Sequence, residues 1–188
     1  MSIYYGDGSN SGAGRVVQVI FKEKKAAWAS SVTSSEVVPT QMYQTITTKS
    51  NTSKVIMEVK MCLAVGSSYN GSQWKIRRNS GTDNLTVSGS ANLFVGDSDG
   101  SRDQATMGMQ GPTMGGGSSA LHGFTCGTTF LDTPGNAGAY TYFVTFRDTV
   151  ASDNFFYLNR GYNDENNQNQ PRSVSGILLM EIASWLMI

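Results

Sequence analysis

The stretch Val55-Ile56-Met57-Glu58-Val59-Lys60-Met61-Cys62-Leu63-Ala64-Val65 decides the fold class of this 188-residue chain. Its odd-numbered positions are all apolar, whereas Glu58, Lys60 and Cys62 stand at alternating positions. Successive side chains of a β-strand point to opposite faces, so a period of two predicts a strand with one face packed on a core. The stretch therefore indicates a sheet with one buried side.

Shorter β-like runs, separated by turn residues, recur along the rest of the chain. Asn70-Gly71, Asp99-Gly100 and Asn79-Ser80-Gly81 are turn sequences because their residues tolerate positive φ. No stretch carries a capped helical stripe, so we expect little helix. About eight to ten strands predict an all-β, single-domain, antiparallel, jelly-roll-like sandwich. The expected strands besides 55–65 are residues 15–21, 43–48, 73–77, 92–95, 124–131, 139–150, 154–159 and 174–187.

Composition and charge exclude several classes of protein. Charged residues make up 15% of the chain, and fourteen basic residues balance fourteen acidic ones. Without a basic field we expect no nucleic-acid partner. No apolar run reaches the ~18 residues of a membrane span, and the first residues lack the apolar core of a signal peptide, so we expect neither membrane insertion nor export. We expect Cys62 and Cys126 to be free thiols in a reducing cytoplasm.

The last predicted strand differs from the others because both of its faces are apolar. Residues 177, 179, 183 and 185 alternate with residues 178, 180, 182 and 186, and all eight are apolar. An exposed strand of this kind is prone to aggregate, so a symmetric subunit interface is expected to bury the second face; burial by the chain's own segments is the alternative. The residues predicted to form this oligomer interface are Ile177, Leu179, Trp185, Leu186 and Ile188.

Four segments, in this order, resemble a domain of marine and cyanobacterial phages that is described as a tail-fibre-like or virion structural protein. Each is a strand-and-turn pattern without catalytic residues, and the resemblance as a whole covers roughly residues 15–183. They are Thr48-Lys49-Ser50-Asn51-Thr52-Ser53-Lys54-Val55-Ile56-Met57-Glu58-Val59, Phe94-Val95-Gly96-Asp97 with Ser101-Arg102-Asp103-Gln104-Ala105-Thr106-Met107, Phe130-Leu131-Asp132-Thr133-Pro134, and Leu178-Leu179-Met180-Glu181-Ile182-Ala183.

The resemblance implies a trimeric jelly roll of the kind seen in fibre heads. It therefore implies a non-enzymatic structural protein on the virion surface, assembled in the host cytoplasm, whose partners are its own copies and other virion proteins such as major capsid or tail proteins. The chain has no repeat shaft, unlike many fibre proteins, so we expect residues 1–14 to form an anchoring arm and residues 15–188 the jelly-roll domain. Tyr4, Tyr5 and Asp7 are the predicted anchoring residues.

The sequence contains no convincing motif for a catalytic or metal-binding site, and we predict no catalytic residue, metal ligand or cofactor. His122 is the single histidine, and it lacks the G-x-S-x-G setting of a nucleophile, so we interpret it as a strand residue. Asp97-Ser98-Asp99-Gly100-Ser101-Arg102-Asp103 spaces oxygen atoms as a calcium loop does, but it lacks the closing Glu. A hairpin loop with an Arg–Asp pair is the preferred interpretation.

A polar loop supports an alternative function, in which the chain is a tail-fibre module that binds a host-surface glycan. Residues 163–170 are almost wholly amide and acid, and Tyr162 stands before them. Glycan sites combine amides, acids and a stacking aromatic ring, which this loop supplies. The residues predicted for this receptor loop are Tyr162, Asn163, Asp164 and Asn166.

Overall fold

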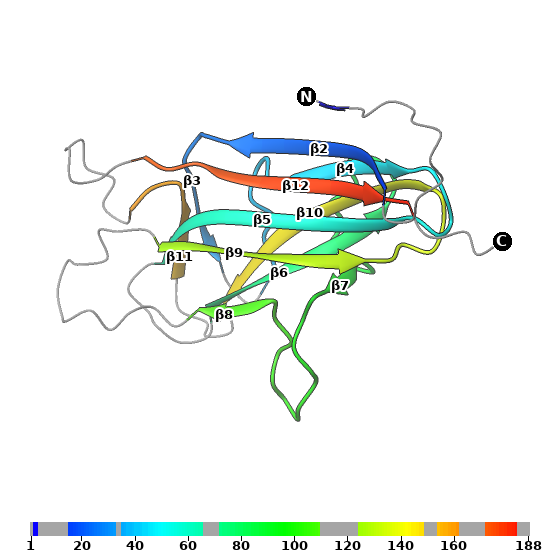
Figure 1. Cartoon of the computed structure of the whole chain (residues 1–188). Helices are drawn as coiled ribbons and strands as arrows, with labels where there is room; N and C mark the ends of the chain where they lie inside the picture. The colour runs from blue at the N-terminus through cyan, green and yellow to red at the C-terminus, as the bar shows by residue number, and fades with distance from the viewer. Residues whose placement is uncertain are drawn as a thin grey trace.

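The computed structural model describes residues 2–3, 15–32, 35–65, 72–109, 124–148, 154–161 and 172–183. Throughout these residues the regular secondary structure is β, in two antiparallel sheets (Figure 1). The prediction of an all-β sandwich is confirmed. The jelly-roll connection between its strands stays a prediction.

Sheet A contains seven strands and sheet B contains five. Most neighbouring strands are distant in the sequence, so the chain passes repeatedly between the two layers (Figure 1). Sheet A runs β1 (Ser2–Ile3), β2 (Val16–Lys24), β12 (Ser175–Ile182), β5 (Lys54–Val65), β11 (Asn154–Leu158) and β3 (Trp28–Val32), with β9 (Phe124–Asp132) on the free side of β5. Sheet B runs β4 (Tyr43–Thr48), β10 (Gly138–Asp148), β6 (Ser72–Ser80) and β7 (Ala91–Leu93), with β8 (Met107–Met109) also paired to β6.

The core lies between the sheets, and β5 supplies one side of it as its alternation predicts. The odd-numbered residues from Val55 to Leu63 are at most 1% exposed, whereas Glu58 and Lys60 point to solvent. Sheet B contributes the large side chains on the opposite wall. They are Trp74, Ile76, Tyr142, Val144 and Phe146.

Strand positions agree with expectation where alternation is strong and depart from it where strands are short. The segment Tyr43–Thr48 is a strand with the predicted bounds. In contrast, Trp28–Val32 and Met107–Met109 were not expected, because their Ala, Ser and Gly residues give no apolar alternation. Both are held in place by pairing with β11 and β6, which is a tertiary effect.

The prediction that Ile177 and Leu179 lie at an oligomer interface is wrong for these two residues. They are 1% and 0% exposed within a single chain, because they face sheet B and belong to the core. The other face of β12 points outward and presents Leu178, Met180 and Ile182, each partly exposed. Trp185, Leu186 and Ile188 lie outside the described residues. The strand does have two apolar faces, and Ile177 and Leu179 lie on the inner one.

Asn159, just after β11, joins three parts of sheet A at one end of the sandwich. It is fully buried and has a φ of 64°, in the left-handed region that asparagine tolerates better than most residues. Its Nδ2 donates to the carbonyl oxygen of Lys24 at 2.6 Å, and its Oδ1 accepts from the Ser175 hydroxyl at 2.6 Å. Its backbone N–H donates to the carbonyl oxygen of Cys62 at 2.9 Å. The side chain of Asn159 thus links β2 to β12, and its backbone N–H adds β5.

Replacing Asn159 by Ala should lower the free energy of unfolding by about 3 kcal/mol, because buried groups lose their partners and Ala resists positive φ. Asn159→Gly keeps the backbone freedom but not the hydrogen bonds, so its loss should be smaller. Urea titration followed by fluorescence measures both. The exposed Asn92 is the control, and Asn92→Ala should change stability by less than about 0.5 kcal/mol. Equal stability of the wild type and Asn159→Ala would contradict this role.

Candidate functional site

The outer face of sheet A, which points away from sheet B, carries an unusual number of apolar side chains. One row runs straight across four strands, because Val19, Met180, Ile56 and Leu131 are successive cross-strand partners. The next row adds Phe21 and Leu178 as direct partners. We call these six residues the apolar face: Val19, Phe21, Ile56, Leu131, Leu178 and Met180.

Solvent reaches this apolar face directly. Phe21 is 51% exposed and Leu131 is 53% exposed, and the other four are only partly covered. Single exposed apolar residues are common on soluble proteins, but contiguous apolar patches mark surfaces that bind a partner. Cross-strand registry makes this patch contiguous. It is therefore the part of the described surface best suited to burial against another molecule.

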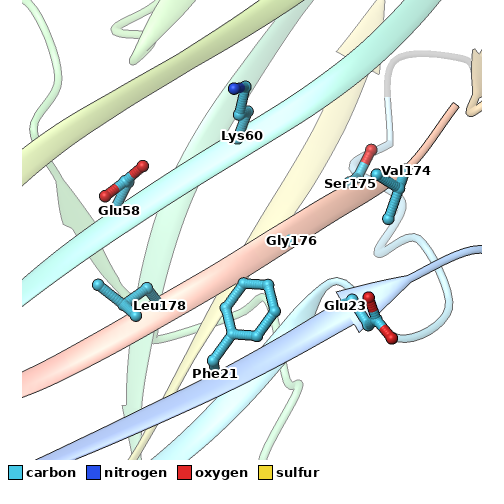
Figure 2. Close-up of a pocket in the computed structure, with 8 residues that line it drawn as sticks. All are labelled: Phe21, Glu23, Glu58, Lys60, Val174, Ser175, Gly176 and Leu178. Carbon is cyan, nitrogen blue, oxygen red and sulfur yellow. The ribbon is translucent and has the colours of Figure 1, made fainter.

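A groove of about 230 Å³ opens beside the apolar face, over the start of β12 (Figure 2). Its floor is Gly176, and Phe21, Leu178 and Val174 form apolar walls. A Cβ atom on Gly176 would lie 3.0 Å from the Phe21 ring and 3.2 Å from the Lys22 carbonyl oxygen, so the absence of a side chain keeps the floor open. The charged rim consists of Glu23, Glu58 and Lys60.

The outer face of sheet B is the opposite in character, since it is polar, buried and ion-paired. The Glu36 carboxylate accepts hydrogen bonds from Arg77 and, at 2.6 Å, from the Thr145 hydroxyl. Lys75 lies 3.3 Å from the same carboxylate, and the side chains of Glu36, Lys75 and Arg77 are all less than 10% exposed. We call Glu36, Lys75, Arg77 and Thr145 the ionic cluster.

Two of the chain's own loops seal this face of sheet B. Residues 81–90 do so at one end, where Asn79 Nδ2 donates to the Thr86 carbonyl oxygen at 2.7 Å and Arg77 donates to the Ser90 hydroxyl at 2.8 Å. Residues 94–106 form the projecting loop between β7 and β8, at the bottom of Figure 1. Its Asp103 accepts from Arg147 at 3.0 Å. Sheet B is thus closed by internal contacts, and sheet A is open.

A buried carboxylate, Glu181, holds separate segments of the sandwich together. Glu181 is completely buried and accepts three hydrogen bonds of 2.6 Å, from Gln18 Nε2, the Lys49 backbone N–H and the Ser53 hydroxyl. This carboxylate links the segment that contains Lys49 and Ser53 to the C-terminal segment. These three donors are neutral groups, which suits a fixed structural acceptor.

Asp132 and the Asp97–Asp103 region also act as structural acceptors. Asp132 accepts from Arg78 and, at 2.7 Å, from the Tyr142 hydroxyl, whose pKa is raised above its usual value mainly by burial. Asp99 pairs with Arg102 at an exposed site, as predicted, but the strands that flank this loop, β7 and β8, pair with β6 and not with each other as in a hairpin. Among the described residues, no group of three or more His, Cys, Asp or Glu side chains is placed to hold a metal ion.

The two cysteines lie on neighbouring strands and are free thiols. Cys62 is partly exposed on β5, and Cys126 on β9 is buried. Burial, with a smaller contribution from Cys62, raises the pKa of the Cys126 thiol to about 12. Cys126 therefore stays protonated near neutral pH.

Several predicted site residues lie outside the part of the chain that the structure describes. They are the anchoring residues Tyr4, Tyr5 and Asp7, the receptor-loop residues Tyr162, Asn163, Asp164 and Asn166, and His122. Sequence reasoning missed Phe21, Leu131 and Val174 as surface residues. The sequence could have predicted the exposure of Phe21, because both faces of β2 are partly apolar. Val17, Val19 and Phe21 lie on one face, and Val16, Gln18 and Ile20 alternate with them.

Comparison of the chain with protein-family models and with curated proteins finds no match. Within the described residues, no helix has the length and apolar character needed to cross a membrane.

The ionic cluster predicts a pH dependence of stability. Burial, the largest influence, raises the pKa of the Glu36 carboxyl, but hydrogen bonds from Arg77 and Thr145 and the charges of Arg77 and Lys75 outweigh it and lower the pKa to about 2. Since this folded value lies below the ordinary 4.5, the stabilisation is present above about pH 4.5 and is lost as the pH falls toward 2. It amounts to about 3 kcal/mol.

Chemical denaturation at a series of pH values tests this contribution. The difference in unfolding free energy between the wild type and Glu36→Gln should be large at pH 7 and should shrink as the pH approaches 2. Asp99→Asn, which breaks an exposed ion pair, is the control and should show a small difference at every pH. A Glu36→Gln difference that is constant from pH 7 to pH 2 would exclude a depressed pKa at Glu36.

Proposed function

We propose that the chain is a non-enzymatic structural subunit of a phage virion surface, which assembles with copies of itself, as a homotrimer, through the apolar face of sheet A. The observation that carries the proposal is the contrast between the two outer faces. Sheet B is sealed by its own loops and its charges are paired, whereas sheet A leaves Phe21 and Leu131 about half exposed. A subunit that buries this face against a neighbour removes the apolar patch from water.

The charge pattern supports a second copy as the neighbour. Glu58 is the cross-strand partner of Leu178, Lys60 is the partner of Gly176 in the following row, and the two side chains carry opposite charges. The whole chain has a formal net charge of zero, so identical copies do not repel one another at long range. A surface that carries charges of both signs can therefore pack against another copy of the chain without net repulsion.

The polar chemistry of the segments that resemble phage proteins supports a structural role. Glu181, Asp132 and Asp103 each accept hydrogen bonds that join separate strands or loops. These residues stabilise the framework and do not converge on one cleft. The virion location and the threefold symmetry rest on the resemblance itself, and the anchoring role of residues 1–14 belongs to the same proposal.

Light scattering coupled to size exclusion tests the assembly. The wild type should elute as a homotrimer, and Met180→Glu should be monomeric because it places a charge in the centre of the apolar row. Thr47→Glu adds the same charge at an exposed position of β4 in sheet B and should leave the trimer intact. Thermal melting followed by circular dichroism verifies that both variants are folded. A monomeric wild type would refute the assembly proposal.

Mass spectrometry of purified particles tests the virion location. Peptides of the chain should be found in particles from phage lysates after density-gradient purification, in a constant ratio to the major capsid protein. Recovery only in the soluble fraction would contradict a virion role. The result is independent of symmetry, so it separates the location of the protein from its oligomeric state.

A further inference from the structure

Phe94, at the end of β7, combines two features that are unfavourable in an isolated subunit. Its φ is 49°, in the left-handed region, and its side chain is 57% exposed. A positive φ is rare for a bulky residue, because its Cβ atom then lies too close to the following carbonyl oxygen. Glycine or asparagine would relieve the backbone, and a polar residue would suit the exposure. The combination points to a contact outside the subunit.

The Phe94 ring is held in a defined position. It stacks on Phe130 of β9, with the ring centroids 5.7 Å apart and the ring planes at 19°. The contact covers one face of the ring, and more than half of the residue's surface is still exposed. A rigid aromatic side chain that projects from a surface loses little entropy when a partner buries it.

The groove over Gly176 has the size and chemistry to receive such a ring. It is apolar on three sides, with Phe21, Leu178 and Val174 as walls (Figure 2). Its volume is about 230 Å³, and an apolar cavity of about 150 Å³ already accepts benzene. Val174 at its rim is 54% exposed, so the groove is open in the isolated chain.

Phe94 and the groove lie on different parts of the subunit. Phe94 packs beside β9, while the groove lies over β2, β12 and β5 on the outer face of sheet A. The stack on Phe130 keeps the ring away from its own groove. The two features can therefore meet only between different copies.

We propose that Phe94 of one copy inserts into the groove formed by Phe21, Val174, Gly176 and Leu178 of the next copy. This proposal rests on the proposed self-assembly and specifies the geometry of the contact. The interface is heterologous, because the ring of one subunit packs in the groove of its neighbour. A heterologous contact closes into a ring when the rotation between subunits permits it, and a trimer is such a ring.

Charges near the two surfaces are consistent with this contact. In the loop that follows Phe94, Asp99 pairs with Arg102, and Asp103 pairs with Arg147. At the groove, Glu23 lies 2.9 Å from Lys25, and Glu58 and Lys60 carry opposite charges. Glu23, Asp99 and Asp103 each have an ion-pair partner within their own subunit, so burial of the ring leaves none of these three carboxylates unpaired.

Mixing two defective variants tests the geometry. Phe94→Asp removes the projecting ring, and Val174→Asp places a charge in the groove, so each variant alone should be monomeric in light scattering. A mixture of the two contains one intact ring and one intact groove, and should therefore form a one-to-one dimer. Asn92→Asp adds the same charge at an exposed site two residues from Phe94 and should assemble like the wild type.

Phe94→Gly serves as a second variant, because glycine adopts the positive φ of residue 94 without strain and favours a folded chain. It should be folded by circular dichroism and should raise the dissociation constant of assembly roughly 30- to 100-fold, from the apolar area that is no longer buried.

If Phe94→Gly and Phe94→Asp assembled as strongly as the wild type, the proposed contact would be overturned, whereas the proposed homotrimer would stand. Monomeric variants whose mixture also remains monomeric would overturn the heterologous geometry. A monomeric wild type would instead contradict the proposed function itself.

Discussion

The alternation along β5 is the constraint on which the rest of the structure depends. This strand pairs with β12 and β11 on one side and with β9 on the other, so its register sets the register of most of sheet A. A shift by one residue would turn Met57, Val59 and Met61 to solvent and bury Glu58 and Lys60. The packing of sheet B on sheet A allows only the observed register, because the facing wall contains Trp74 and Phe146.

Polar residues at the ends of the sandwich complete this framework. Glu181 joins β12 to β2 and to the turn before β5, and Asn159 joins the end of β11 to β2 and β12. Both side chains are fully buried, and each makes several short hydrogen bonds. Buried polar groups that are fully paired favour one arrangement over its alternatives, because any other register would leave them unpaired. These residues therefore act on specificity of folding as much as on stability.

The two outer faces have different physical consequences for the subunit. Sheet B directs Lys75 and Arg77 outward, where Glu36 from the segment before β4 and the loop residue Ser90 pair with them, so these electrostatic interactions are satisfied internally. Sheet A directs Val19, Ile56 and Met180 outward and provides no comparable cover within the described residues. An apolar face without cover is stable in water only at a cost, and association is the direct means of removing it. The proposed role as an assembling structural protein follows from this asymmetry.

The sequence by itself determined the fold class and most of the strands, because period-two alternation is a local signal that residues such as Val55 to Val65 carry unaided. It also determined that the C-terminal strand has two apolar faces. Which face turns inward, so that Ile177 and Leu179 join the core and Leu178 and Met180 face outward, was decided only by the pairing of β12 between β2 and β5. The short strand Trp28–Val32, the ionic cluster around Glu36 and the strained position of Phe94 likewise arise from contacts between segments far apart in the chain. Local patterns do not encode such contacts, so the candidate surface required the tertiary structure.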